Sequence, residues 1–282
     1  MAQYLQKLNQ MIARRRTRNI IIFLIIAGGL SFYFCTLSQT LTDITIITGW
    51  SLFGLMVFLT LYNLRKKFTF LPLGSSAAWL QLHIYAALLT GVLFLFHIDF
   101  KIPHGNLEVT MTVMYLLVFI SGVIGIIITR QFPKRLSSRD EEYIFERIPV
   151  YRKVLRERAE TLALDSVTDT NSSLIAEFYR DELASFISQP QYLFQHFWES
   201  RRPLLKLLRK VDNLTDYTSE KEKKYLKEMR ELVVQKYDLD YSLCLQGCLK
   251  YWLFIHIPFT YSLMIFTVLH VILVYAFTGG MS

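Results

Sequence analysis

Five long apolar stretches constrain the fold of this chain more than any other feature. A helix needs about 20 predominantly apolar residues to cross the hydrocarbon core of a membrane. The 282 residues are 52% hydrophobic and 19% charged, which is too apolar for a soluble domain of this size. We therefore predict an all-α fold, an integral membrane bundle of five transmembrane helices. The five stretches lie at residues 19–37, 44–62, 76–98, 109–129 and 248–277.

A charged, amphipathic segment at residues 131–247 separates the fourth and fifth apolar stretches. It contains no glycine-rich phosphate loop and no dinucleotide-binding fingerprint, so a nucleotide or flavin domain is not expected. Ser219 and Glu222 form the capping-box pattern that begins a helix. We predict a helical cytoplasmic insert that docks a redox partner, with a regulatory or structural role as the alternative. Helical periodicity recurs at residues 138–162, 173–187, 191–211 and 219–236.

The domain plan follows from these segments. We expect a cytoplasmic N-terminal segment at 1–18, four transmembrane helices within 19–130, the insert at 131–247, and the fifth helix with the C-terminus at 248–282.

Basic residues near the ends of the apolar stretches predict the orientation, because such residues tend to stay in the cytoplasm. In the segments that would lie on the opposite side of the membrane, only Lys101 is basic. We expect the N-terminus inside and the C-terminus outside a bacterial inner membrane. The net charge of +8 is then explained by basic residues that gather at the cytoplasmic lipid surface. No nucleic-acid partner is expected. The basic residues on the inner side are Arg14, Arg15, Arg16, Arg18, Arg65, Lys66, Lys67, Arg130, Lys134 and Arg135.

Four of the six histidines lie inside two of the apolar stretches. His83 and His97 lie in the third stretch, and His256 and His270 lie in the fifth. In each stretch the second histidine follows the first by fourteen residues, which is close to four helical turns, or about 21 Å along one helix face. Ionisable side chains inside a membrane are costly and mark a functional site by default.

The two stretches also share the sequence frame W-L-x-x-H-I around His83 and His256. Both run from the cytoplasm outward in the predicted topology, so His83 is level with His256 and His97 is level with His270. Each level then supplies the two imidazoles that a low-spin b-type haem needs, one on each face of the ring. Cys244 and Cys248 lack the CxxCH pattern of covalent c-type haem.

On these four histidines the sequence resembles the transmembrane di-haem cytochrome b proteins, both those of the cytochrome bc type and the ferric reductase-like family. The resemblance covers the second to fifth apolar stretches. It implies two haem b groups, with iron held by His83 and His256 and by His97 and His270. It also implies electron transport in a respiratory chain, with a quinone as a possible partner. The long insert, and the absence of a flavin and nicotinamide domain, depart from the family plan.

Several other residues are candidates for the same site. Glycines allow close approach of a haem or of a neighbouring helix. His104 is either a proton relay near the outer haem or simply an exposed residue. The sequence indicates no function for His196, which lies in the insert. Basic residues at the inner face either pair haem propionates or only follow the positive-inside rule. These glycines are Gly49, Gly54, Gly91, Gly122 and Gly125, and the basic residues are Arg65, Lys66, Lys67, Arg130 and Lys250.

We interpret the chain as a di-haem membrane cytochrome b, the electron-transfer subunit of an oxidoreductase complex. It would pass electrons between quinone or quinol and a partner such as an iron–sulfur protein or a c-type cytochrome. One alternative is a ferric or oxygen reductase fed by a separate flavoprotein. A second is a metal or proton transporter, although one ion would need histidines three or four residues apart on a helix.

Overall fold

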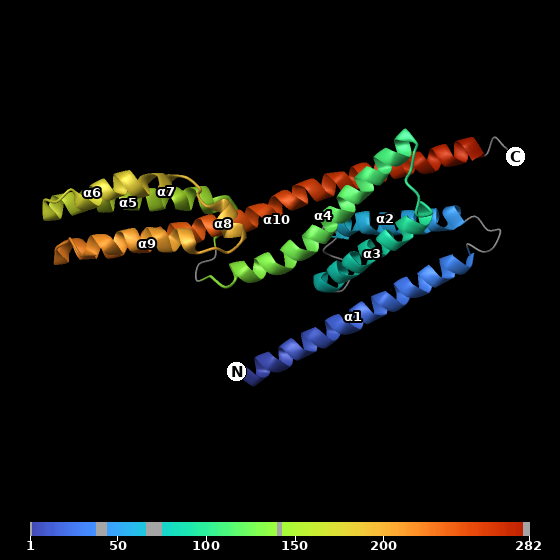
Figure 1. The fold of residues 1–282 in the computed structure, drawn as a ribbon, viewed down its shortest axis with the longest axis horizontal. Coiled ribbons are helices and arrows are strands. Elements are labelled where there is room, and N and C mark those ends of the chain that lie inside the picture. Colours follow the sequence, from blue (N-terminus) through green and yellow to red (C-terminus); the bar gives the residue numbers. More distant parts are fainter. Residues whose placement is uncertain (1, 38–43, 66–74, 140–142, 279–282) are drawn as a thin grey trace. The chain divides into compact units, whose positions relative to one another are not determined.

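The computed structural model describes residues 2–37, 44–65, 75–139 and 143–278, and their regular secondary structure is entirely helical (Figure 1). The predicted all-α fold is confirmed. Lys66 and Lys67, the link at 38–43 and the tail at 279–282 lie outside the described residues. Within the described ranges, five helices are long and apolar enough to cross a membrane, in the segments Thr17–Leu37, Ile44–Tyr62, Ser76–His97, Asn106–Leu136 and Glu220–Phe277.

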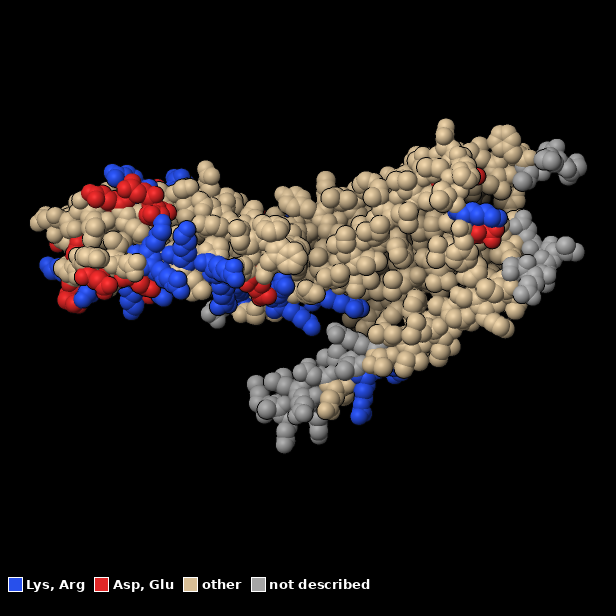
Figure 2. Space-filling model, in the orientation of Figure 1, with Lys and Arg blue, Asp and Glu red and all other residues tan. Residues whose placement is uncertain are grey.

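The chain forms two compact units, which are described separately. The first, here called the membrane unit, comprises Met1–Ile126 and Phe254–Ser282. The second, the insert unit, comprises Ile127–Leu253. Charged side chains are dense over the insert unit and sparse over the apolar helices of the membrane unit on the face seen in Figure 2.

The membrane unit is built from apolar helices whose ends are set by local signals. The Ser75 side chain caps the third helix by accepting a hydrogen bond from the amide of Ala78 at 3.3 Å. That helix ends at His97, because Asp99 and Phe100 adopt left-handed backbone with φ of 50° and 54°. The helices are α1 (Ala2–Leu37), α2 (Ile44–Arg65), α3 (Ser76–His97), the first part of α4 (Asn106–Leu136) and the last part of α10 (Glu220–Thr278).

The core of the membrane unit joins these helices around α3. The rings of Phe94 and Tyr115 stack with centroids 4.1 Å apart. The Tyr115 hydroxyl donates to Thr90 Oγ1 at 3.0 Å, which satisfies two buried polar groups between α3 and α4. A Cβ at Gly91 would lie 2.9 Å from the Phe119 ring, so this glycine serves close packing of α3 against α4. The buried cluster consists of Phe34, Leu52, Met56, Leu93, Phe94, Tyr115 and Leu263.

Two helices of the insert unit differ in length from those that the sequence predicted. The predicted helix at 191–211 is divided, because Glu199 adopts left-handed backbone with φ of 58°. The predicted helix at 219–236 instead continues through the fifth apolar stretch as α10. The elements are η1 (Phe145–Arg147), α5 (Ile148–Thr170), α6 (Leu174–Phe178), η2 (Tyr179–Leu183), α7 (Ala184–Ser188), α8 (Leu193–Phe197) and α9 (Arg202–Thr215), with the end of α4 and the start of α10.

The capping box at the start of α10 is confirmed. The amide of Ser219 donates to Glu222 Oε2 at 2.8 Å, and the amide of Glu222 donates to Ser219 Oγ at 3.5 Å. These reciprocal bonds satisfy amides that have no partner within the helix.

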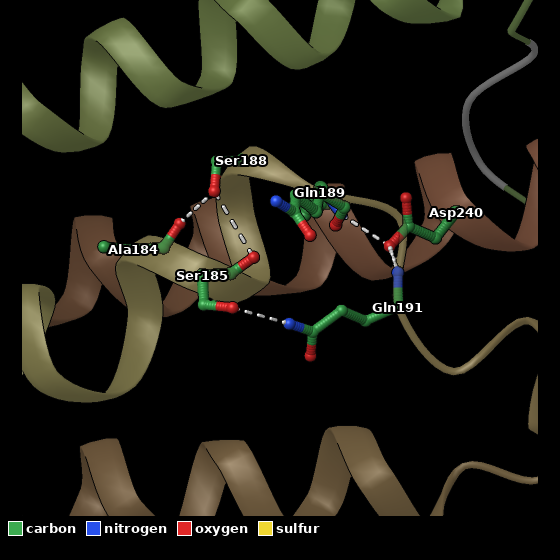
Figure 3. A network of polar contacts seen from close by, with 7 residues as sticks. Ala184, Ser185, Ser188, Gln189, Gln191 and Asp240 are labelled. Carbon is green, nitrogen blue, oxygen red and sulfur yellow. Dashed lines mark hydrogen bonds and ion pairs between the residues drawn. The ribbon is translucent and has the colours of Figure 1, made fainter.

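A buried ion pair on α10 fixes the turn between α7 and α8. Figure 3 labels Asp240 of this pair beside Gln189 and Gln191 of the turn. Lys236 Nζ lies 2.5 Å from Asp240 Oδ2, and both side chains are 0% exposed. The lysine also donates to the carbonyl of Gln189 at 3.0 Å, and the amide of Gln191 donates to Asp240 Oδ2 at 3.0 Å. The pair therefore fastens the Gln189–Gln191 turn to α10 by charge-assisted hydrogen bonds.

His196 is part of the core of the insert unit. Its ring is 1% exposed and lies 4.4 Å from the ring of Tyr237. Burial, together with the charges of Lys236 and Arg139, lowers the pKa of His196 to about 4. The histidine is therefore neutral at physiological pH and packs as a core residue.

Candidate functional site

The outer pair of predicted ligands, His97 and His270, lies together in the membrane unit. Their ring centroids are 6.4 Å apart and their planes are perpendicular, at 90°. The last residue of α3 thus meets the C-terminal part of α10 across a cavity of about 700 Å³ that both histidines line. That volume lies within the range typical of cofactor sites, about 300–1,000 Å³.

The backbone of α2 holds the His97 ring in place. His97 Nδ1 lies 3.1 Å from the carbonyl oxygen of Thr45, which can only accept, so Nδ1 carries the proton and donates. This tautomer leaves the lone pair on Nε2, the arrangement found in metal-ligating histidines. A Cβ at Gly49 would lie 3.0 Å from His97 Cε1, so only glycine lets the ring rest against α2 at this distance.

The cavity around the outer pair has an aromatic wall and a polar edge. Trp50 Nε1 donates to the Tyr275 hydroxyl at 3.0 Å, which links α2 to α10 beside the cavity. The exposed residues Lys101, His104 and Glu108 also line it. His104, for which the sequence offered no spaced partner, thus shares a cavity with His97 and His270.

The helix α4 orients His256. Ser121 Oγ lies 2.8 Å from the carbonyl oxygen of Val118 and 2.7 Å from His256 Nδ1. The hydrogen bond to Nδ1 holds the His256 ring against α4, and the tautomer of the ring sets which of the two groups donates. Gly122 also adjoins this ring, since a Cβ there would lie 3.7 Å from His256 Cε1, an ordinary contact distance.

The remaining predicted ligand, His83, packs against α2. Its ring centroid lies 4.7 Å from that of Tyr62, with the planes tilted by 39°. The structure brings the predicted outer pair, His97 and His270, to a centroid separation of 6.4 Å at the cavity. The level pairing of His83 with His256 stays a prediction, and the contacts described for these rings are those with Tyr62 and with Ser121.

The other candidates have mixed roles. A Cβ at Gly54 would meet no described atom within 4 Å, so this glycine serves no close approach. Lys250 lies 3.2 Å from Glu146 and over the Phe145 ring, within the insert unit. Arg130 is exposed, while Lys66 and Lys67 and the side chain of Arg65 lie outside the described residues.

Sequence reasoning missed the groups that orient the ligands. The Thr45 contact is made by a backbone carbonyl, which leaves no trace in the residue type. The sequence could have indicated Ser121, because a hydroxyl group in an apolar stretch must find a hydrogen-bond partner.

Among the described residues, no group of three or more histidine, cysteine, aspartate or glutamate side chains gathers as a metal site. No protein family, curated protein or solved structure matches this chain. The interpretation of the site therefore depends on its own geometry.

Proposed function

We propose that the chain is a di-haem cytochrome b subunit that transfers electrons across the membrane. The observation that carries the proposal is the placement of His97 and His270 together at the cavity. Two imidazole rings that line one cavity with their centroids 6.4 Å apart could hold one haem iron between them. The 6.4 Å between the two centroids supports this use of the pair.

The surroundings of His97 support the same role. The Thr45 carbonyl sets the tautomer and limits rotation of the ring, and Gly49 allows the ring to lie close to α2. Ser121 limits rotation of the His256 ring through a hydrogen bond to Nδ1. Such partners raise the basicity of a ligating nitrogen and keep it aimed at the metal. We assign His97 and His270 to the outer haem and His83 and His256 to the inner one.

When bound, each haem would supply a one-electron carrier, and the two imidazoles of its pair would hold the iron. The protein positions these rings, excludes water with apolar side chains and offers polar contacts at the cavity edge. Lys101 and His104 are suited to hydrogen-bond propionates there, because both are exposed donors that line the cavity.

The partners and location belong to the same proposal. Electrons would pass between quinone or quinol and an iron–sulfur or c-type cytochrome subunit in a bacterial inner membrane. The positive-inside pattern favours a cytoplasmic N-terminus and insert. A cysteine introduced at Ser172 should then resist an impermeant reagent added outside intact cells, and ready labelling would reverse the orientation.

Replacing Gly49 with alanine should weaken retention of the outer haem alone. The added Cβ would force His97 to shift by a few tenths of an ångström. Disturbing a group that orients a metal ligand costs about 10–100-fold in affinity, and we expect an effect near the lower end. Haem dissociation to an excess of apomyoglobin measures it. Gly54→Ala is the matched control, because its Cβ meets open space; equal losses in both variants would contradict the assignment.

The proposed function itself is tested by anaerobic mixing of the purified protein with NADPH, with a quinol analogue, and with any co-purifying redox subunit. The haem α band reports reduction. We expect reduction by quinol or by the partner and none by NADPH, because the insert lacks the glycine-rich turn that a dinucleotide needs. Rapid reduction by NADPH in a flavin-free preparation would overturn the proposal.

A further inference from the structure

We propose that α8 is an interfacial anchor that seats the insert unit on a lipid surface containing acidic headgroups. The patch consists of Leu193, Phe194 and Trp198, here called the α8 patch. The inference uses only contacts within the insert unit and does not depend on the histidines of the membrane unit.

The short segment around α8 has an inward and an outward face. His196 is buried, and Phe197 packs against Phe132 of α4 with ring centroids 5.8 Å apart. On the outward face, Phe194 is 74% exposed and Trp198 is 67% exposed. The rings of Phe194 and Trp198 contact each other at 6.4 Å, so they form one continuous aromatic surface. Two large aromatic rings presented together to water are costly and indicate an interaction site.

The inward contacts of α8 lie at the ends of two apolar stretches. Phe132 comes two residues after Arg130, where the apolar part of α4 ends. Cys244 Sγ donates to the carbonyl of Leu193 at 3.2 Å, shortly before the apolar part of α10 begins. Phe197 also belongs to a cluster with Leu249 and Trp252 of α10. The α8 patch therefore adjoins the places where both helices pass between lipid and water, and aromatic residues concentrate at that depth.

The charges beside the α8 patch favour acidic lipid as the occupant. Arg201 and Arg202 follow Trp198 after Glu199, which pairs with Arg135, and Ser200. Arg130 and Lys134 lie on the adjoining part of α4. All four are exposed, and none forms an ion pair with a residue that the structure describes. Exposed aromatic side chains combined with basic residues are the pattern by which interfacial helices bind acidic membranes. The α8 patch adjoins the ends of two apolar stretches and lies beside exposed basic residues. Together these two observations favour acidic lipid over a protein partner as the occupant.

The depth of the α8 patch in the membrane can be measured with a spin label attached to a cysteine. Oxygen concentrates in lipid and a nickel chelate stays in water, so the collision rates of the label with the two reagents show which phase surrounds it. The full chain carries Cys35→Ala, Cys244→Ser and Cys248→Ala, so that the label is confined to Phe194→Cys. Nanodiscs are made from phosphatidylglycerol mixed with phosphatidylcholine. The matched control is Tyr217→Cys, because Tyr217 is 83% exposed in the same unit and follows α9 at its far end from Trp198.

We expect oxygen collisions to dominate at position 194 and chelate collisions to dominate at position 217. Pure phosphatidylcholine, or Arg201→Gln with Arg202→Gln, should make the label at 194 more accessible to the chelate. Chelate access at 194 equal to that at 217 would overturn the proposal. Protection from both reagents would also overturn it, because it would show that a protein partner or a second copy covers the α8 patch. If the Phe194→Cys chain fails to fold, Trp198→Cys carries the same test.

Discussion

Replacing His97 with alanine is expected to lower the haem content of the purified protein from two haems per chain to one. The lost haem should be the outer one, because the rings of His97 and His270 line the same cavity with their centroids 6.4 Å apart. A single remaining imidazole leaves one axial position open, and a b-type haem has no covalent link to retain it. His270→Ala should remove the same spectral component, as seen by redox titration of the haem α band.

The matched control for this experiment is His104→Ala. His104 lines the same cavity but is exposed and belongs to the link between α3 and α4. Both haems should therefore remain bound in this variant. The inner haem should depend instead on His83 and His256. If His83→Ala and His270→Ala remove the same spectral component, the proposed pairing is wrong.

Replacing Asp240 with alanine is expected to produce the largest loss of stability in the insert unit. The change leaves Lys236 fully buried without its counter-ion, and breaking a buried pair in this way costs about 3–5 kcal/mol. The turn at Gln189–Gln191 would also lose its fastening to α10. Hydrogen exchange of amides in α5 and α9 should accelerate by about a hundredfold or more, since each 1.4 kcal/mol corresponds to a factor of ten.

Two variants show whether charge burial causes this loss. Asp212→Ala removes the partner of Arg230 in an exposed pair, which should cost less than about 1 kcal/mol. Replacing both buried residues, as Lys236→Met with Asp240→Leu, should restore much of the protection, because an apolar pair avoids the unpaired charge. Exchange as fast in the double variant as in Asp240→Ala would contradict this explanation.

The helical membrane fold could be predicted from the sequence because its signals are local and strong. Each long helix of low charge overlaps one apolar stretch, and the Ser219 and Glu222 pattern identified the start of α10. The divided helix at 191–211 could not be predicted, because its break depends on left-handed backbone at Glu199, a residue type that usually continues a helix. Tertiary packing on α4 and α10 holds that turn.

The candidate site was accessible to sequence reasoning only in part. The fourteen-residue spacing indicated that two histidines share one face of each helix, and the structure brings His97 and His270 together. The groups that orient the rings were not accessible, because Thr45 acts through its backbone and Gly49 through the absence of a side chain. The shared cavity with His104 depends on how the link after α3 folds, which periodicity does not determine.

The most direct test of the central claim is the pyridine haemochrome spectrum of the purified full-length protein, combined with its protein concentration. The account predicts two non-covalent b-type haems per chain, one for each pair of membrane histidines. Protein that contains no haem after expression with adequate haem supply, or that carries covalent c-type haem, would contradict it.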